Sequence, residues 1–329
     1  MSIAQNPEPI RISIITPSYN QGRFLSQTIE SILSQEGDFT IDYIIIDGGS
    51  RDNSLEIIKK YEVLLIDGTW PIRCKGIRYR WLSEKDRGQT DALNKGFLKA
   101  EGDILAWLNS DDTYLPGALN LIASSFRNNP NIGLVYGKAW FIDESGKKLR
   151  EVNTGPTDFQ GLAALNLICQ PAAFFRRSVL DAAGPMDVDL HYTMDHDLWI
   201  RMSRISRLLH IEHYLATYRM HGESKSMSPR QALGFQVEIL HTVMKYYHWA
   251  PANRVFGLSY HRIRTMLPPA LGQYQTLVTL LAIVYVPFLY IILNRGRIRM
   301  DDLRMLNRKN FIKVKRGEID NERFLSGES

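Results

Sequence analysis

Short apolar, β-branched runs alternate with helix-like stretches along the first half of the chain. Residues 10–16 (IRISIIT), 41–47 (IDYIIID) and 104–108 (ILAWL) have the pattern of buried strands. Between the first two, residues 22–35 repeat apolar side chains at a helical period. The same reading predicts a strand over 79–82 and helices over 50–61, 90–99 and 116–127, the first N-capped by Ser50. Repeated βα units of this kind predict an α/β fold with a Rossmann-like, mostly parallel sheet flanked by helices.

The pattern changes twice further along the chain. Residues 133–225 mix short strands with a helix around Asp195–Arg207, and after about residue 226 the βα alternation ends. The strands of this middle part are predicted at 134–136, 139–142 and 214–218, and a helix follows at 231–248. We therefore expect a catalytic-type domain over 9–226 and a C-terminal helical region over 227–329.

The C-terminal region contains an 18-residue stretch, 276–293, that has no charged residue and is just long enough to span a bilayer. Pro287 is expected to kink or break a helix there. Basic residues flank both sides, and the tail 295–316 carries nine lysines and arginines against two aspartates. A span would place one basic flank outside, so an in-plane or re-entrant helix pair with its basic flanks on anionic headgroups is favoured over a span. The alternative is a buried helix of a small bundle.

Composition excludes several classes of protein. Hydrophobic residues make up 44% and charged residues 23%, which are ordinary globular values. The two cysteines cannot form a disulfide framework, and the first ten residues do not resemble a signal peptide, so a reducing compartment is expected. The net charge of +5 comes from the end of the chain, because residues 226–329 hold 15 basic and 7 acidic residues. Since this charge adjoins an apolar segment, we expect it to meet a membrane surface and not a nucleic acid.

Ligands of parallel sheets bind beyond the carboxyl ends of the strands, so the polar residues there are candidates for chemistry. Asp111 and Asp112 follow the strand 104–108, where two adjacent acids suit a hard divalent ion bound with a nucleotide diphosphate. A solvated turn that caps the next helix is the alternative. Asp47 ends another strand before two glycines, which permit close approach of a ligand or simply a tight turn.

Two further groups come from the middle of the chain. Asp195 and Asp197 stand at the predicted start of a helix, where a carboxylate stays ionised and can accept a proton, or can merely cap the helix. Arg219 and His221 follow a strand and could bind phosphate or metal, or lie in a surface loop. The glycine fingerprint of dinucleotide-binding folds and the phosphate loop of ATPases are both absent from the sequence.

Taken together, five segments in order resemble glycosyltransferase family 2, whose members have the GT-A fold and use nucleotide sugars. The resemblance covers about residues 10–226 and is far more specific than any single motif. The matching segments are TPSYNQGRFLSQTIESILSQ at 16–35, IIIDGGSRDNS at 44–54, SEKDRGQTDALNKGFLKAEGDILAWLNSDD at 83–112, CQPAAFFRRSVLDAAGPMDVDLHYTMDHDLWIR at 169–201 and YRMHGESKS at 218–226.

The resemblance also implies roles for single residues. Asp195 would be the catalytic base, with Asp197 as a competitor, because Met194 replaces the glutamate of the family's Glu-Asp pair. Asp112 would hold Mn²⁺ or Mg²⁺, and Asn109-Ser110 departs from a strict DxD motif, which predicts a weak, phosphate-dependent metal site. The nucleotide sugar would be bound by Thr16, Pro17, Tyr19, Asp47, Arg87, Asp111 and Arg219, with His221 beside the metal and the diphosphate.

The function implied is an inverting transfer of one sugar, most often from a UDP-sugar in this family, to a hydroxyl of the acceptor. The apolar segment suggests a lipid-linked or membrane-proximal glycan as the acceptor, at the cytoplasmic face of the membrane. Two alternatives stay open, a catalytically silent partner that binds nucleotide sugars and a sugar nucleotidyltransferase. The sequence identifies neither the sugar nor the oligomeric state.

Overall fold

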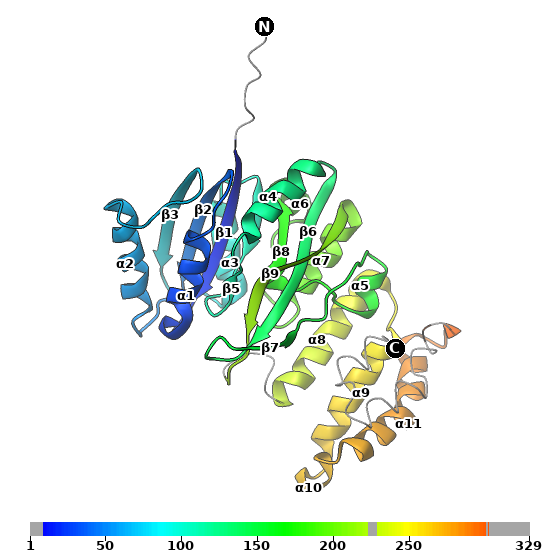
Figure 1. Ribbon diagram of the computed structural model, residues 1–329. Helices are drawn as coiled ribbons and strands as arrows, with labels where there is room; N and C mark the ends of the chain where they lie inside the picture. The colour runs from blue at the N-terminus through cyan, green and yellow to red at the C-terminus, as the bar shows by residue number, and fades with distance from the viewer. Residues whose placement is uncertain (1–8, 223–228, 301, 303–329) are drawn as a thin grey trace. The chain divides into compact units, whose positions relative to one another are not determined.

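The computed structural model describes residues 9–222, 229–300 and 302, so most of the predicted basic tail and residues 223–226 lie outside the described residues. The chain forms two compact units (Figure 1). The first comprises Met1–Asp158, Leu167–Asp189 and Arg201–His221, and the second comprises Phe159–Asn166, Leu190–Ile200 and Gly222–Ser329. The second unit thus includes two short segments that the sequence analysis assigns to the catalytic-type domain.

Parallel strands form the first half of the sheet, as predicted. β1 (Ile10–Ser18) pairs in parallel with β2 (Phe39–Asp47) on one side and with β4 (Ile104–Trp107) on the other. β3 (Gly76–Ser83) extends the sheet beyond β2. Parallel pairing brings the carboxyl ends of these strands to one edge, where the candidate residues follow.

The second half of the sheet is mixed. The strand order is β3-β2-β1-β4-β8-β6-β9-β5, with β7 paired to β6. β6 runs parallel to β9, whereas β8 is antiparallel to both β4 and β6. The bounds are β5 (Thr113–Tyr114), β6 (Ile132–Ile142), β7 (Lys148–Glu151), β8 (Ala173–Arg176) and β9 (Arg207–Arg219). The two short strands predicted at 134–136 and 139–142 are one strand, and β9 begins seven residues before the predicted strand.

Helices cover both faces of the sheet. Alternate strand residues such as Ile12 and Ile14 belong to the core cluster formed with α1, α2 and α4. On the other face α3 packs so closely that a Cβ at Gly96 would lie 2.4 Å from the side chain of Ile15. The bounds are α1 (Gly22–Leu33), α2 (Ser54–Ile66), α3 (Gln89–Lys99), α4 (Ala118–Asn128) and α6 (Arg177–Ala183), with the 3-10 turn η1 (Gln170–Ala172). Ser50 does not cap α2, because its hydroxyl donates to Asp47 instead.

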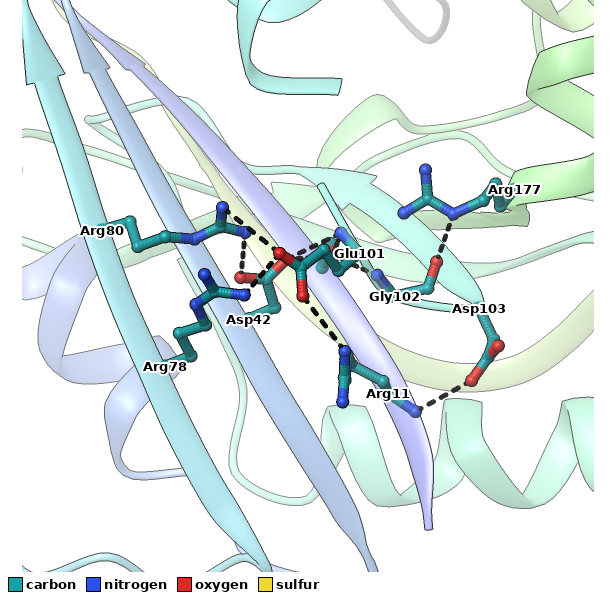
Figure 2. Close-up of polar contacts among 9 residues, drawn as sticks. Arg11, Asp42, Arg78, Arg80, Glu101, Gly102, Asp103 and Arg177 are labelled. Carbon is teal, nitrogen blue, oxygen red and sulfur yellow. Dashed lines mark hydrogen bonds and ion pairs between the residues drawn. The ribbon is translucent and has the colours of Figure 1, made fainter. Parts of the chain in front are cut away.

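Charged residues form a network near the amino ends of the first strands (Figure 2). The buried carboxylate of Asp42 pairs with Arg80 and accepts hydrogen bonds from the Ser13 hydroxyl at 2.6 Å and the Glu101 amide at 3.0 Å. Glu101 in turn forms ion pairs with Arg11 and Arg78. We call these residues the amino-edge network. Asp42 and Glu101 both have cationic partners, which indicates a structural role.

The second unit is helical and has its own core. Its helices are α5 (Gly161–Ala164), the first turns of α7 (Met194–Ile205), α8 (Pro229–Tyr247), α9 (Ala252–Met266), α10 (Pro269–Gly272) and α11 (Gln275–Leu293). α9 and α11 pack through a cluster that includes Phe256, Tyr260, Val286 and Tyr290. α11 is the one helix of the described chain that is long and apolar enough to cross a membrane, and it continues through Pro287.

Candidate active site

The end of β2 is fixed by Asp47, whose carboxylate is fully buried. It accepts hydrogen bonds from the amides of Gly49 and Ser50 at 3.1 and 3.0 Å and from the hydroxyl of Ser83 at 2.7 Å. Gly49 adopts a φ of +80°, a conformation that favours glycine, so the turn can close tightly after the strand. The bonds to Asp47 shape the loop where the sequence analysis expects a nucleotide.

The end of β1 lies beside this loop and presents an aromatic ring. Thr16 is buried and accepts a hydrogen bond from the Tyr43 hydroxyl at 3.1 Å, and Pro17 is buried as well. Tyr19 is 58% exposed. The amide of Asn20 donates to the Ser50 hydroxyl at 2.8 Å, which ties the two loops together. The arrangement offers an open ring next to a rigid polar loop, as a base-binding site requires.

The end of β4 carries Asp111 and Asp112, and the end of β9 meets them. Asp112 is 2% exposed and accepts hydrogen bonds from the Arg219 amide at 2.9 Å and the Asn109 side chain at 3.3 Å. Burial and the neighbouring charge of Asp111 raise the pKa of Asp112 well above its usual range. Nε2 of His221 lies 2.9 Å from Oδ2 of Asp111. Strand pairing thus brings four of the predicted residues into one cluster, which we call the acidic cluster.

The Arg219 guanidinium is held rigidly. It donates to the carbonyl oxygens of Asp111, Asp143 and Glu144 at 2.8 to 3.1 Å and to the side chain of Gln27 at 2.7 Å. Burial lowers the pKa of Arg219, and the charges of Asp112 and Asp111 oppose this effect. Arg219 therefore braces the loop after β4 as well as supplying a positive charge.

Sequence reasoning missed two residues, Gln170 beside the acidic cluster and Asp86 beside the loop after β2. Gln170 accepts a hydrogen bond from Asn109 at 3.1 Å and donates to the Trp107 carbonyl at 2.8 Å. Asp86 approaches Gly48 so closely that a Cβ there would lie 2.7 Å from its carboxylate. Arg87, by contrast, precedes α3, forms an ion pair with Asp91 of that helix and is largely exposed. Gln170 lies in the block CQPAAFF, which resembles the family, but the 3-10 turn η1 separates it from β8, so no local pattern marks it.

In the second unit, Asp195 and Asp197 have different surroundings although they stand on one helical turn. Asp195 is partly exposed and accepts hydrogen bonds from the His196 amide at 2.7 Å and the Asn166 side chain at 3.4 Å. Burial raises the pKa of Asp195 to about 6. Asp197 is 1% exposed, and its Oδ1 accepts from the Tyr246 hydroxyl at 2.6 Å and from Lys245 at 3.3 Å. Asp195 is thus the better placed to accept a proton, and Asp197 joins α7 to α8.

A third acid, Glu238 of α8, fixes the segment that leads into α7. Its Oε1 accepts hydrogen bonds from the amides of Tyr192 and Thr193, both at 2.7 Å, and from the Thr193 hydroxyl at 3.0 Å. Thr193 also contacts Thr242 at 3.1 Å. Because a carboxylate at a helix N-terminus satisfies otherwise free amides, Glu238 holds the turn that carries Asp195. No sequence motif predicts this role of Glu238.

Comparison with known proteins now identifies the chain. The family model described as glycosyl transferase family 2 matches residues 13–184, just over half of the chain. The chain belongs to glycosyltransferase family 2. An uncharacterized glycosyltransferase of Nostoc sp. is 30% identical to this family 2 glycosyltransferase over 237 residues, 69% of the chain and 70% of the relative. The chondroitin synthase of Escherichia coli is 24% identical over 66% of the chain, but the chain spans only 30% of that protein.

Solved structures agree on the fold. The S. aureus protein TarS, residues 1–349, in complex with UDP-GlcNAc matches with a TM-score of 0.56 and 16% identity, covering 96% of this chain and 90% of that one. The mannosyltransferase from Pyrobaculum calidifontis in complex with GDP-Man and Mn²⁺ gives a TM-score of 0.58 at 14% identity, covering 97% and 86%. The sheet of this family 2 glycosyltransferase and its covering helices therefore form a GT-A fold, as predicted.

Proposed function

We propose that this glycosyltransferase moves one sugar from a nucleotide diphosphate sugar, with UDP favoured, to a hydroxyl of a lipid-linked or membrane-proximal glycan, with inversion. The acidic cluster is the observation that carries the proposal. Asp112 is buried and the partly exposed Asp111 precedes it, so two like charges lie side by side at the carboxyl edge of the parallel strands. Such a site suits a cation bound together with phosphate oxygens.

The loops after β1 and β2 support the donor half of the proposal. Tyr19 offers a largely exposed ring on which a base can stack, and Asp47 fixes the amides of the second loop. Thr16 and Pro17 close the floor of this region, since both are buried. Two of the solved neighbours hold UDP-GlcNAc and GDP-Man, which favours the same class of donor here. Arg87 would contact the donor only after leaving Asp91.

The residues fit a divalent ion that takes part of its coordination from the substrate. In the described part of the chain, no group of three or more histidine, cysteine or acidic residues could enclose an ion. Asp112, with Asp111 and His221 beside it, matches the one or two carboxylates with which Mg²⁺ or Mn²⁺ is usually held next to phosphates. When bound, the ion would neutralise charge on the departing diphosphate. Its presence would also stabilise the like-charged pair.

Asp195 is the proposed base. A sugar hydroxyl must lose its proton as it attacks, and a carboxylate with a pKa near 6 is ionised at neutral pH yet basic enough to accept that proton. Asn166 and the His196 amide orient the carboxylate. One displacement with an oxocarbenium-like transition state then inverts the anomeric carbon, and Arg219 supplies positive charge beside the acidic cluster.

The outer face of α11 supports a place at a membrane. Val284, Phe288 and Ile292 lie one turn apart and are 65 to 70% exposed, whereas Val278, Val286 and Tyr290 are buried on the opposite face. Further exposed apolar residues are Leu280, Leu281, Ile283, Tyr285 and Ile291. An exposed apolar face of this size marks an interaction site, and basic residues on both sides of the helix suit anionic headgroups.

The packing of α11 favours a helix that lies in the membrane surface. Its buried face packs on α9, which ends with the exposed residues Arg262 and Arg264. A spanning α11 would bring α9, which carries these two charges, into the bilayer with it. The free cysteines Cys74 and Cys169 agree with a reducing compartment, so we propose the cytoplasmic face of the membrane.

Vesicle flotation tests this part of the proposal. We expect the protein to float with vesicles that contain anionic lipid, and Phe288→Glu to reduce the bound fraction about tenfold. Leu98→Glu is the matched control, because Leu98 is 87% exposed on α3 and plays no part in the contact. Alkaline extraction should release the protein, as it does for surface-bound helices. Retention after extraction would support a span instead, and equal loss of binding in both variants would contradict a contact through α11.

A donor-hydrolysis screen tests the catalytic function. Purified protein with Mn²⁺ is offered UDP-, GDP- and dTDP-sugars, and released nucleotide diphosphate is measured. We expect release from one donor, with loss in Asp112→Ala. Release of pyrophosphate from a nucleoside triphosphate and a sugar phosphate would support a nucleotidyltransferase. Donor binding by calorimetry without turnover, even in the presence of candidate acceptors, would support a silent binding partner.

A further inference from the structure

Arg254 is a buried cation for which the described residues provide no anionic partner. It is the third residue of α9 and is 8% exposed. Within 9–222, 229–300 and 302, neither its Nε nor its Nη2 has a hydrogen-bond partner. Burial alone lowers the pKa of Arg254 to about 10, and no acidic neighbour opposes this effect. The guanidinium therefore stays charged at neutral pH while buried and unneutralised.

Such an arrangement is unfavourable unless something else binds there. An unpaired buried charge loses its hydration and gains nothing in return, so buried charges are normally paired or ligate an ion. Replacing this arginine with an apolar side chain of similar length would stabilise a protein that had no use for it. The retained charge in a buried position points to a ligand.

The surroundings of Arg254 place that ligand near the proposed base. Arg254 lies near the first turn of α7, because both elements contact α5: Asn253, the residue before Arg254, donates to the Ala164 carbonyl at 2.7 Å, and His196 contacts the Leu162 carbonyl. The charge of Arg254 adds to burial in lowering the pKa of His196 to about 3. Nε2 of His196 donates to the Leu162 carbonyl at 2.7 Å, so the buried Nδ1 of the neutral ring is an acceptor, and it has no partner in the described chain. Asp195 directly precedes His196. All of these residues belong to the second unit.

A second helix contributes another unmatched atom. Gln236 of α8 is 7% exposed, and its Oε1 has no hydrogen-bond partner among the residues described. Gly257 lies one turn along α9 from Arg254, and a Cβ there would be 2.4 Å from that oxygen. Among the described residues, α7 and α8 thus each hold a buried acceptor without a partner, which suits a hydroxyl group, and α9 holds a buried donor group without one, which suits an anion.

We infer that Arg254 binds a phosphate group of the acceptor. The inference rests on the proposed function, because it takes Asp195 as the base that faces the acceptor hydroxyl. A guanidinium matches two phosphate oxygens at once, and the planar fork of arginine suits this geometry better than lysine does. We assign the phosphate to the molecule that carries the hydroxyl, because the segment 162–166 contacts Asp195 through Asn166 and the start of α9 through Ala164.

Thermal shift with phosphate ligands tests the inference without any need for turnover. We expect millimolar inorganic diphosphate to raise the Tm of the wild type and of Arg207→Met, a control at an exposed residue that opens β9. Arg254→Met should fold, with an unchanged or higher Tm in the absence of ligand, and should bind diphosphate roughly 10- to 100-fold more weakly. Arg254→Lys should recover part of the affinity.

Two further arms decide the source of the phosphate. A prenyl diphosphate in detergent that binds at least tenfold more tightly than inorganic diphosphate would support a lipid-linked acceptor, and equal affinities would support a soluble phosphorylated one. A tenfold loss of UDP affinity in Arg254→Met, measured by calorimetry, would assign the arginine to the donor and overturn the inference. So would equal stabilisation of Arg254→Met and wild type by diphosphate, or a Tm of both Arg254 variants far below the wild type. Failure of the donor screen with intact diphosphate binding would reject only the proposed function.

Discussion

The two edges of the parallel strands treat acidic residues in opposite ways. At the amino edge, Asp42 and Glu101 are matched by Arg11, Arg78 and Arg80 (Figure 2). At the carboxyl edge, Asp111 and Asp112 stand together, and the amide and guanidinium of Arg219 brace the loop around them. The first arrangement is complete within the protein, whereas the second gains from a cation and a phosphate.

The same contrast recurs on α7. Asp197 is buried and is held by Lys245 and Tyr246, while Asp195, two residues earlier, meets only neutral donors. An acid that is paired with a cation inside the fold stabilises the structure. An acid without a cationic partner is available for chemistry. The comparison can be broken or sharpened by substituting one acid of each kind.

The largest effect is expected at α7. Asp195→Asn should lower kcat by roughly 10² to 10⁴, because the amide cannot accept the proton, while nucleotide binding persists. Asp197→Asn should mainly lower the Tm. Turnover of each variant and its melting curve are compared with those of the wild type. An inactive Asp197→Asn together with a fully active Asp195→Asn would reverse the comparison and assign the base to Asp197.

The raised pKa of Asp195 adds a pH dependence to this test. Only the carboxylate accepts a proton, so kcat/KM should fall tenfold per pH unit below about pH 6 and level off above it. This acid limb should disappear in Asp195→Asn, measured on its residual activity. An unchanged limb in that variant would assign the titration to another group.

At the carboxyl edge, Asp112→Asn should lower transfer by roughly 10² to 10³ and leave the Tm unchanged or higher, because one of two adjacent like charges is removed. Removal of divalent ions by a chelator should have a similar effect on the wild type and little further effect on the variant. Full activity after chelation would contradict the role given to Asp112.

At the amino edge, Asp42→Asn should lower the stability and leave the activity unchanged, the reverse of Asp112→Asn. The change leaves Arg80 without its buried partner and should cost roughly 3 kcal/mol of folding free energy, while the activity per folded molecule stays close to that of the wild type. Denaturant unfolding measures the first quantity and turnover at low temperature the second. A loss of activity without a loss of stability would break the distinction between the two edges.

The smallest effect is expected at Glu238. Glu238→Gln keeps an acceptor oxygen but loses the charge, so kcat should fall by about tenfold and the acid limb should move to lower pH, since the charge of Glu238 helps to raise the pKa of Asp195. Thr242→Val is the control that disturbs the same contact without changing a charge. An equal shift of the pH profile in both variants would point to a purely structural role.

The sequence was sufficient for the strands that are buried on both faces. Continuous apolar runs predict β1, β2 and β4, and the polar residues after them predict the acidic cluster. β6 was split in two because Gly137 and Lys138 interrupt its apolar run. In the structure Gly137 is required there, since a Cβ would lie 2.6 Å from the His213 carbonyl.

Residues that act across long sequence separations could not be predicted. Gln170 reaches Asn109 across 61 residues, and Glu238 reaches Thr193 across 45. Neither belongs to a local pattern, because their partners are backbone amides or side chains that only the tertiary fold brings near. The burial of Arg254 could not be predicted either, because the sequence places it among the basic residues that flank the segment 276–293, where a position at the membrane surface was expected.

The arginines of β3 have a consequence for solubility. β3 is the terminal strand of the sheet, and within the described chain its outer edge pairs with no further strand. Its sequence alternates Arg78 and Arg80 with Tyr79 and Trp81, so without the arginines it would be an aromatic, β-prone edge. Charged side chains on an edge strand discourage pairing with the edge of another molecule. The residues that balance Asp42 and Glu101 therefore also protect the protein against aggregation through its open sheet edge.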